Sequence, residues 1–92
     1  MGRKSLAEEY LDEVPEGEEA EGTWLVMYDF GSKPNPRFWG NLRRLRGLVG
    51  ESSMVQYSVF MTRSRRGAMV AEKLATHYGA KVDVFKGEQV EF

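Results

Sequence analysis

The chain has 92 residues, a formal net charge of −1 and no cysteine. Its length fits one small domain, and the missing cysteines exclude disulfides, zinc–thiolate sites and cysteine nucleophiles. The lack of cysteine also agrees with a reducing cytoplasm, which is where we expect the protein. No apolar run approaches the roughly 20 residues that span a bilayer, so no membrane partner is expected.

The two signs of charge are separated along the chain. Positions 1–22 hold eight acidic and two basic residues, a formal charge of −6. Positions 23–92 hold eleven basic and six acidic residues, a formal charge of +5. A basic folded part attracts polyanions such as nucleic acid. The alternative is that the arginines only keep helix faces soluble.

We therefore divide the chain into an acidic, flexible leader at 1–22 and a folded domain at 23–92. The stretch 16–22 has no apolar face and repels itself, so the leader is expected to lie outside the core. Ser5 to Glu13 could still form one or two helical turns. Two roles stay open for the leader: a solubilising tail, or an acidic arm that covers basic surface and competes with nucleic acid.

The first strand is predicted at Thr23–Phe30. Its even-numbered side chains make one apolar face, and Leu25 and Met27 make the other face apolar as well. A strand that is apolar on both faces is buried on both. Only one layer of helices is available, so we expect the second face to meet the sheet of a second copy, giving a homodimer.

A basic helix is predicted from Pro36 to Val49. Asn35 is a good N-cap, Pro36 suits the first helical position and Gly50 can end the helix. Its apolar residues follow at helical spacing, with arginines on both flanks. Trp39 lies at the edge of the apolar stripe, where core packing is favoured over a base-stacking role.

The next apolar run, Met54–Thr62, forms either one strand or two short strands joined near 56–58. A second helix follows, capped by Ser64 or Thr62 and extending to about Tyr78. A third β run is predicted at Ala80–Lys86 and a last short strand at 89–92.

Enzyme motifs are largely missing from the sequence. It contains no phosphate-binding glycine loop, metalloprotease motif or nucleophile elbow. His77 is the one histidine, and it is expected to complement the dipole at a helix C-terminus rather than to act in catalysis.

Asp29 is the candidate metal ligand and, if the protein is an enzyme, the candidate catalytic residue. A carboxylate at the end of an apolar strand can bind a hard cation such as Mg²⁺. One carboxylate holds magnesium poorly, whereas two copies across a symmetric dimer would do better. An alternative of equal weight is that Asp29 caps the turn that follows the strand.

The arginines are the candidates for binding nucleic acid. Open amides at the helix start near Thr62–Arg66, beside three arginines, are typical of an anion site. We expect double-stranded DNA or RNA to be bound through phosphates, without sequence reading. The candidate residues are Arg37, Arg43, Arg44, Arg46, Arg63, Arg65 and Arg66.

Two motifs resemble the CRISPR-associated protein two family, whose members are small subunits that join the CRISPR integrase during spacer acquisition. One is Tyr28-Asp29 at the end of a hydrophobic strand, and the other is Val55-Gln56-Tyr57-Ser58-Val59-Phe60. A basic helix lies between them, and the resemblance covers about 23–92. The sequence departs from the family at Met61, where an acidic residue is usual, and in the basic start of the second helix.

The resemblance implies an α+β, ferredoxin-like βαββαβ sandwich. Its antiparallel sheet would carry two helices on one face and dimerise through the sheet. It also implies either a DNA-binding scaffold for spacer integration or a magnesium-dependent endonuclease that acts on DNA or RNA through Asp29. A ferredoxin-like interaction module with an unrelated partner is the third alternative. We favour the scaffold, because no second acid lies near Asp29 in the sequence and no base is evident to activate water.

Overall fold

The computed structural model describes residues 4–15, 22–50, 52–56, 58–88 and 90–91. The protein is a small α+β domain with three helices and four strands. In chain order these are α1 (Leu6–Glu13), β1 (Thr23–Asp29), α2 (Pro36–Val49), β2 (Ser52–Gln56), β3 (Val59–Thr62), α3 (Arg65–His77) and β4 (Lys81–Gly87). No helix in these ranges is long and apolar enough to cross a membrane.

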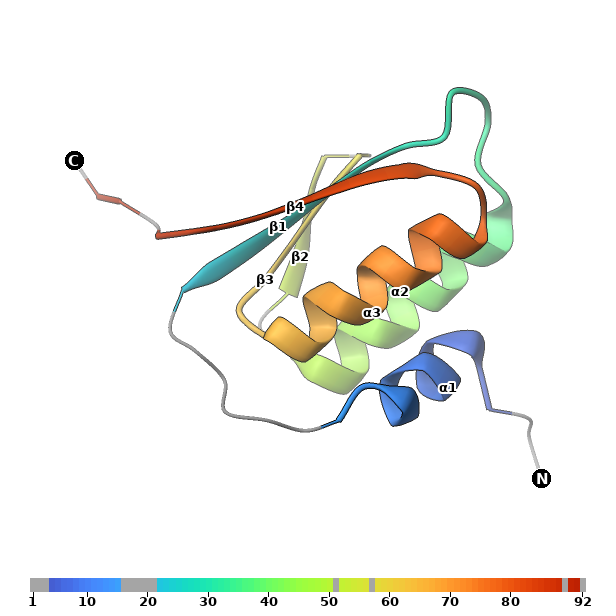
Figure 1. Ribbon diagram of the computed structural model, residues 1–92, viewed down its shortest axis with the longest axis horizontal. Helices are drawn as coiled ribbons and strands as arrows, with labels where there is room; N and C mark the ends of the chain where they lie inside the picture. The colour runs from blue at the N-terminus through green and yellow to red at the C-terminus, as the bar shows by residue number, and fades with distance from the viewer. Residues whose placement is uncertain (1–3, 16–21, 51, 57, 89, 92) are drawn as a thin grey trace.

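The four strands form one antiparallel sheet in the order β2-β3-β1-β4. Helices α2 and α3 pack on one face of this sheet, and α1 lies on the outer side of both helices, away from the strands (Figure 1). The molecule is therefore layered as sheet, helix pair and outer helix. Within the described residues, no element covers the other face of the sheet.

Both long helices begin and end at the signals that the sequence contains. In α2, Asn35 Oδ1 accepts a hydrogen bond from the Arg37 amide at 2.9 Å, and Gly50 ends the helix with a φ of 64°. In α3, Ser64 Oγ accepts from the Gly67 amide at 2.9 Å. The predicted bounds of α2 are confirmed, and Ser64 rather than Thr62 is the cap of α3.

The run Met54–Thr62 is divided between two strands, β2 and β3, that pair as a hairpin. Of the two alternatives, the pair of short strands is confirmed. Met54 lies opposite Phe60 and Gln56 lies opposite Val59, so the register shifts between these pairs. An irregularity of this kind bends a strand locally.

The described residues of the predicted last strand at 89–92 do not form a strand. Val90 and Glu91 belong to no strand, whereas Gln89 and Phe92 lie outside the described residues.

The core lies between the sheet and the helix pair. Alternate residues of β1 and β3 face inward, since Val26, Tyr28 and Phe60 are at most 4% exposed. Both long helices contribute their apolar stripe to this layer. The largest fully buried side chains are Phe38, Phe60, Leu42, Leu45, Leu74, Val26, Val70 and Thr62.

Thr62 is the buried polar residue of this core, and it holds two elements together. Its Oγ1 shares a hydrogen bond with Ser52 Oγ at 2.9 Å and accepts one from the Ser64 amide at 3.0 Å. The first bond joins β2 to β3, and the second fixes the entry into α3.

We expect Thr62→Val to lower the free energy of unfolding by about 1–3 kcal/mol, because it keeps the volume, leaves the Ser64 amide without its acceptor and removes the hydrogen bond to Ser52. Urea unfolding of both proteins measures this. Thr76→Val, at an exposed threonine of α3, is the control and should change stability by less than about 0.5 kcal/mol. Equal stability of Thr62→Val and the wild type would contradict the role given to Thr62.

Helix α1 is the main departure from the sequence prediction. Ala7 and Val14 are 0% and 3% exposed and belong to the core cluster. Ser5 caps the helix in a capping box with Glu8. The expectation that the stretch 1–22 lies outside the core is therefore wrong for 5–14. The high charge of this stretch led to the wrong prediction. Its charged side chains point outward, and a stripe of small and apolar residues faces α2 and α3.

Candidate functional site

Four elements meet at one corner of the molecule. Ser52, which starts β2, donates from Oγ to the Gly50 carbonyl at the end of α2, at 2.6 Å, and its Oγ lies 2.9 Å from Thr62 Oγ1 at the end of β3. The first turn of α3 is close to the end of α2, since a Cβ atom added to Gly67 would lie 3.0 Å from Val49 Cγ2. The C-terminus of α2 and the N-terminus of α3 are thus brought together.

Two of the elements that meet here, α2 and the start of α3, carry exposed arginines from separate parts of the sequence. The exposed side chains are Arg43 and Arg46 on α2, and Arg63 and Arg65 at the start of α3. We call these four residues the basic corner. Arg43, Arg46 and Arg63 form no ion pair with any other residue that the structure describes. The corner therefore offers exposed guanidinium groups suited to phosphate.

The remaining three predicted arginines lie elsewhere. Arg44 Nε is 3.3 Å from Glu8 Oε1. Arg66 is half-buried and donates from Nε to the Val14 carbonyl at 2.9 Å and from Nη2 to the Leu11 carbonyl at 2.6 Å. Arg37 is exposed in the first turn of α2, at the far end of that helix from Arg46.

Glu8 is held in its charged form by these contacts. Hydrogen bonds from the backbone and the side chain of Ser5, followed by the bond from Arg44, lower the pKa of Glu8 below its ordinary value. A charged carboxylate thus faces Arg44 at neutral pH.

Asp29 lies at the opposite end of the sheet from the basic corner, where β1 ends. Its side chain is exposed, and Oδ1 accepts a hydrogen bond from the Gly31 amide at 2.8 Å. This is the turn-capping role that the sequence left open as the alternative to metal binding.

The structure brings a second acid to the same sheet face as Asp29. Lys81 lies directly opposite Asp29 in the register of β1 and β4, and Asp83 lies opposite Met27. Because side chains alternate along a strand, Asp29, Lys81 and Asp83 share the uncovered face. The alternation of Lys81, Asp83 and Phe85 was visible in the sequence, but the pairing of β4 with β1 was not.

These residues line a shallow pocket of about 440 Å³ with Met27, Tyr28 and Ser58. Magnesium requires near-octahedral oxygen coordination. The described residues contain no group of three histidine or carboxylate side chains that could hold a metal ion, and the ammonium of Lys81 faces the same pocket. The described part of one chain therefore does not fit a magnesium site.

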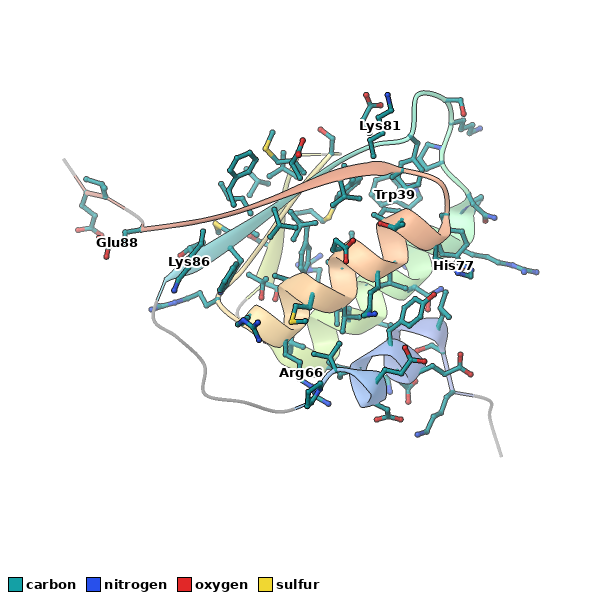
Figure 2. The ribbon with its side chains drawn as sticks, in the orientation of Figure 1. Trp39, Arg66, His77, Lys81, Lys86 and Glu88 are labelled. Atoms are coloured by element: carbon teal, nitrogen blue, oxygen red, sulfur yellow. The ribbon has the colours of Figure 1, made fainter. Side chains whose placement is uncertain are left out.

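The other polar groups in the described residues near Asp29 do not supply a base. Burial raises the pKa of Tyr28 to about 12, so its phenol stays protonated at neutral pH and donates to Met54 Sδ at 3.6 Å. His77 is on the far side of the helix layer, where Nδ1 is 3.1 Å from the hydroxyl of Tyr10 in α1 (Figure 2).

Comparisons with protein-family models, with curated proteins and with solved structures find no match for this chain. Its function must therefore be inferred from the placement of its own residues.

Proposed function

We propose that this protein is a dimeric, cytoplasmic scaffold that binds double-stranded DNA through phosphates and joins a CRISPR integrase in spacer acquisition. The observation that carries this proposal is the basic corner, where two helix ends from separate parts of the chain present exposed guanidinium groups. Guanidinium groups form paired hydrogen bonds with phosphate oxygens. Contacts to phosphate position a duplex without reading its bases. The link to the integrase rests on the resemblance carried by Tyr28-Asp29 and by 55–60.

A ferredoxin-like fold that dimerises through its sheet is the second part of the proposal. It is supported by the strand order β2-β3-β1-β4 and by the position of α2 and α3 on a single face. The uncovered face carries Met27 and Phe85, which are 43% and 54% exposed. Leu25, Val59 and Met61 share this face by register. Covering such a face with a second copy would remove a contiguous apolar surface from water.

The scaffold is favoured over a nuclease because Asp29 already caps a turn and the described residues of one chain do not supply a metal site. One observation favours the second candidate, a magnesium-dependent endonuclease that acts on DNA or RNA. Asp83 lies on the face of Asp29, so two copies facing each other would offer four carboxylates.

Asp29→Asn separates these two candidates. Asparagine keeps the size of the side chain and an oxygen that can accept from Gly31, and it removes the charge that a hard cation requires. We expect the variant to keep its dimer, its affinity for duplexes and its activity in a reconstituted integration reaction. Labelled DNA and RNA incubated with magnesium should remain uncut by both proteins.

Asp83→Asn is the matched variant on β4, and it should behave in the same way. Robust cleavage by the wild type that is lost in Asp29→Asn, together with loss of integration, would replace the scaffold with the nuclease. A protein that binds no nucleic acid would instead be an interaction module with an unrelated partner. A neighbouring CRISPR integrase gene and repeat array would argue against that outcome.

A further inference from the structure

Helix α1 is attached to the rest of the protein through two of the arginines predicted to bind nucleic acid. Arg44 pairs with Glu8 in the first turn of α1. Arg66 reaches from the start of α3 to the end of α1, where it donates to the carbonyls of Leu11 and Val14 (Figure 2). The first contact uses a carboxylate and the second uses carbonyls at the C-terminal end of the helix, which carries partial negative charge. Both arginines are therefore already bound to negative groups.

Apart from these two arginines, α1 is held by further polar contacts and by partly buried Leu6, Tyr10 and Leu11, which pack against the core. The Ala7 amide donates to Asn41 Oδ1 at 2.9 Å, and the Tyr10 hydroxyl is 3.1 Å from His77 Nδ1. The fully buried side chain of α1 is that of Ala7, which contributes little apolar area. A helix of eight residues is marginal in isolation. Helix α1 thus depends on its docked position for its own order.

We infer that α1 is a displaceable cover over Arg44 and Arg66, and that nucleic acid must release it to reach these two residues. This inference rests on the proposed function. Phosphate oxygens would compete with Glu8 and with the two carbonyls for the same N–H donors. Glu9, Asp12 and Glu13 on the same helix would repel a phosphate backbone while α1 is docked.

Release and binding are then linked. If only the undocked form can use all the arginines, the apparent affinity equals the intrinsic affinity multiplied by the fraction of molecules that are undocked. By reciprocity, bound nucleic acid lowers the stability of the docked helix by the same factor. A simple acidic tail would act differently. Its effect on the affinity for nucleic acid would depend on its net charge and not on the packing of α1 against α2 and α3.

Two glutamine substitutions in α1 distinguish a docked cover from a charged tail. Ala7→Gln leaves the net charge unchanged and inserts a larger side chain where none fits. Glu9→Gln removes one negative charge at an exposed position and leaves the buried side intact. Both place a good helix former in the same helix.

We expect Ala7→Gln to bind a 20-base-pair duplex about tenfold more tightly than the wild type, because overpacking loosens the docked helix. Glu9→Gln should change affinity by about twofold or less. Fluorescence anisotropy with one labelled duplex at fixed salt measures all three proteins. If Glu9→Gln raises the affinity for the duplex as much as Ala7→Gln does, or more, the inference is overturned.

Amide hydrogen exchange on the wild-type chain gives a second test that does not depend on a variant. The amides of α1 should lose protection when the duplex is added, while those of α2 and α3 keep theirs. Protection of α1 that persists in the complex would overturn the inference and leave the proposed function intact. If neither the wild type nor Ala7→Gln binds the duplex, the proposed function fails and the inference fails with it.

Discussion

Replacing Arg43, Arg46 and Arg63 together with glutamine is expected to weaken duplex binding by roughly a hundredfold near 0.1 M salt. These arginines are exposed and form no ion pair with the residues that the structure describes, so their charge is available to phosphates. Each lost phosphate contact also reduces the number of counterions released on binding. The slope of log affinity against log salt should therefore become shallower by about 2 to 3.

The matched control is the triple variant Lys33→Gln, Arg37→Gln and Lys81→Gln. It removes the same charge at the opposite end of α2 and of the sheet, and it should weaken binding by about tenfold at most. Unrelated duplex sequences should bind the wild type alike, since phosphate contacts carry no sequence information. Equal losses in the two triple variants would show that only net charge matters and that the basic corner is not the binding surface.

Phe85→Glu is expected to weaken self-association by roughly a hundredfold and to give a monomer at micromolar concentration. The side chain of Phe85 is 54% exposed on the uncovered face of β4. If two copies meet through this face, the substitution buries a carboxylate of each copy in an apolar interface that includes Leu25 and Met61. Light scattering of both proteins gives the mass directly.

Val84→Glu is the control for this variant. Val84 is the preceding residue of the same strand and is 40% exposed, but its side chain points to the helix side of the sheet. Val84→Glu adds the same charge to the same strand and should leave the dimer intact. A wild-type protein that is monomeric at micromolar concentration would rule out dimerisation through the sheet.

Local signals in the sequence predicted the elements of the domain well. Asn35, Pro36 and Gly50 determine α2 through backbone rules that act over a few residues, so its bounds could be predicted from the sequence. The two-strand form of Met54–Thr62 was one of two open alternatives, and the sequence did not decide between them.

The candidate site was harder to predict because it depends on contacts between distant residues. Arg66 looked like a phosphate ligand, yet it binds carbonyls 52 and 55 positions earlier in the chain. Asp83 was overlooked because its closeness to Asp29 follows from strand register and not from spacing. Helix α1 was assigned to a leader because its average charge outweighed the small buried stripe that includes Ala7.

The pairing of β1 with β4 has a consequence for synthesis on the ribosome. Both neighbours of the central strand β1 come later in the chain, and its longest partner, Lys81–Gly87, is the last described strand of this domain to emerge. Contacts of such long sequence separation slow folding. Helix α1 is made first, yet it must wait for α3 before its docking site exists. The domain should therefore fold as one unit only once β4 has emerged, and a chain that stops before Lys81 would expose an open strand edge that favours aggregation.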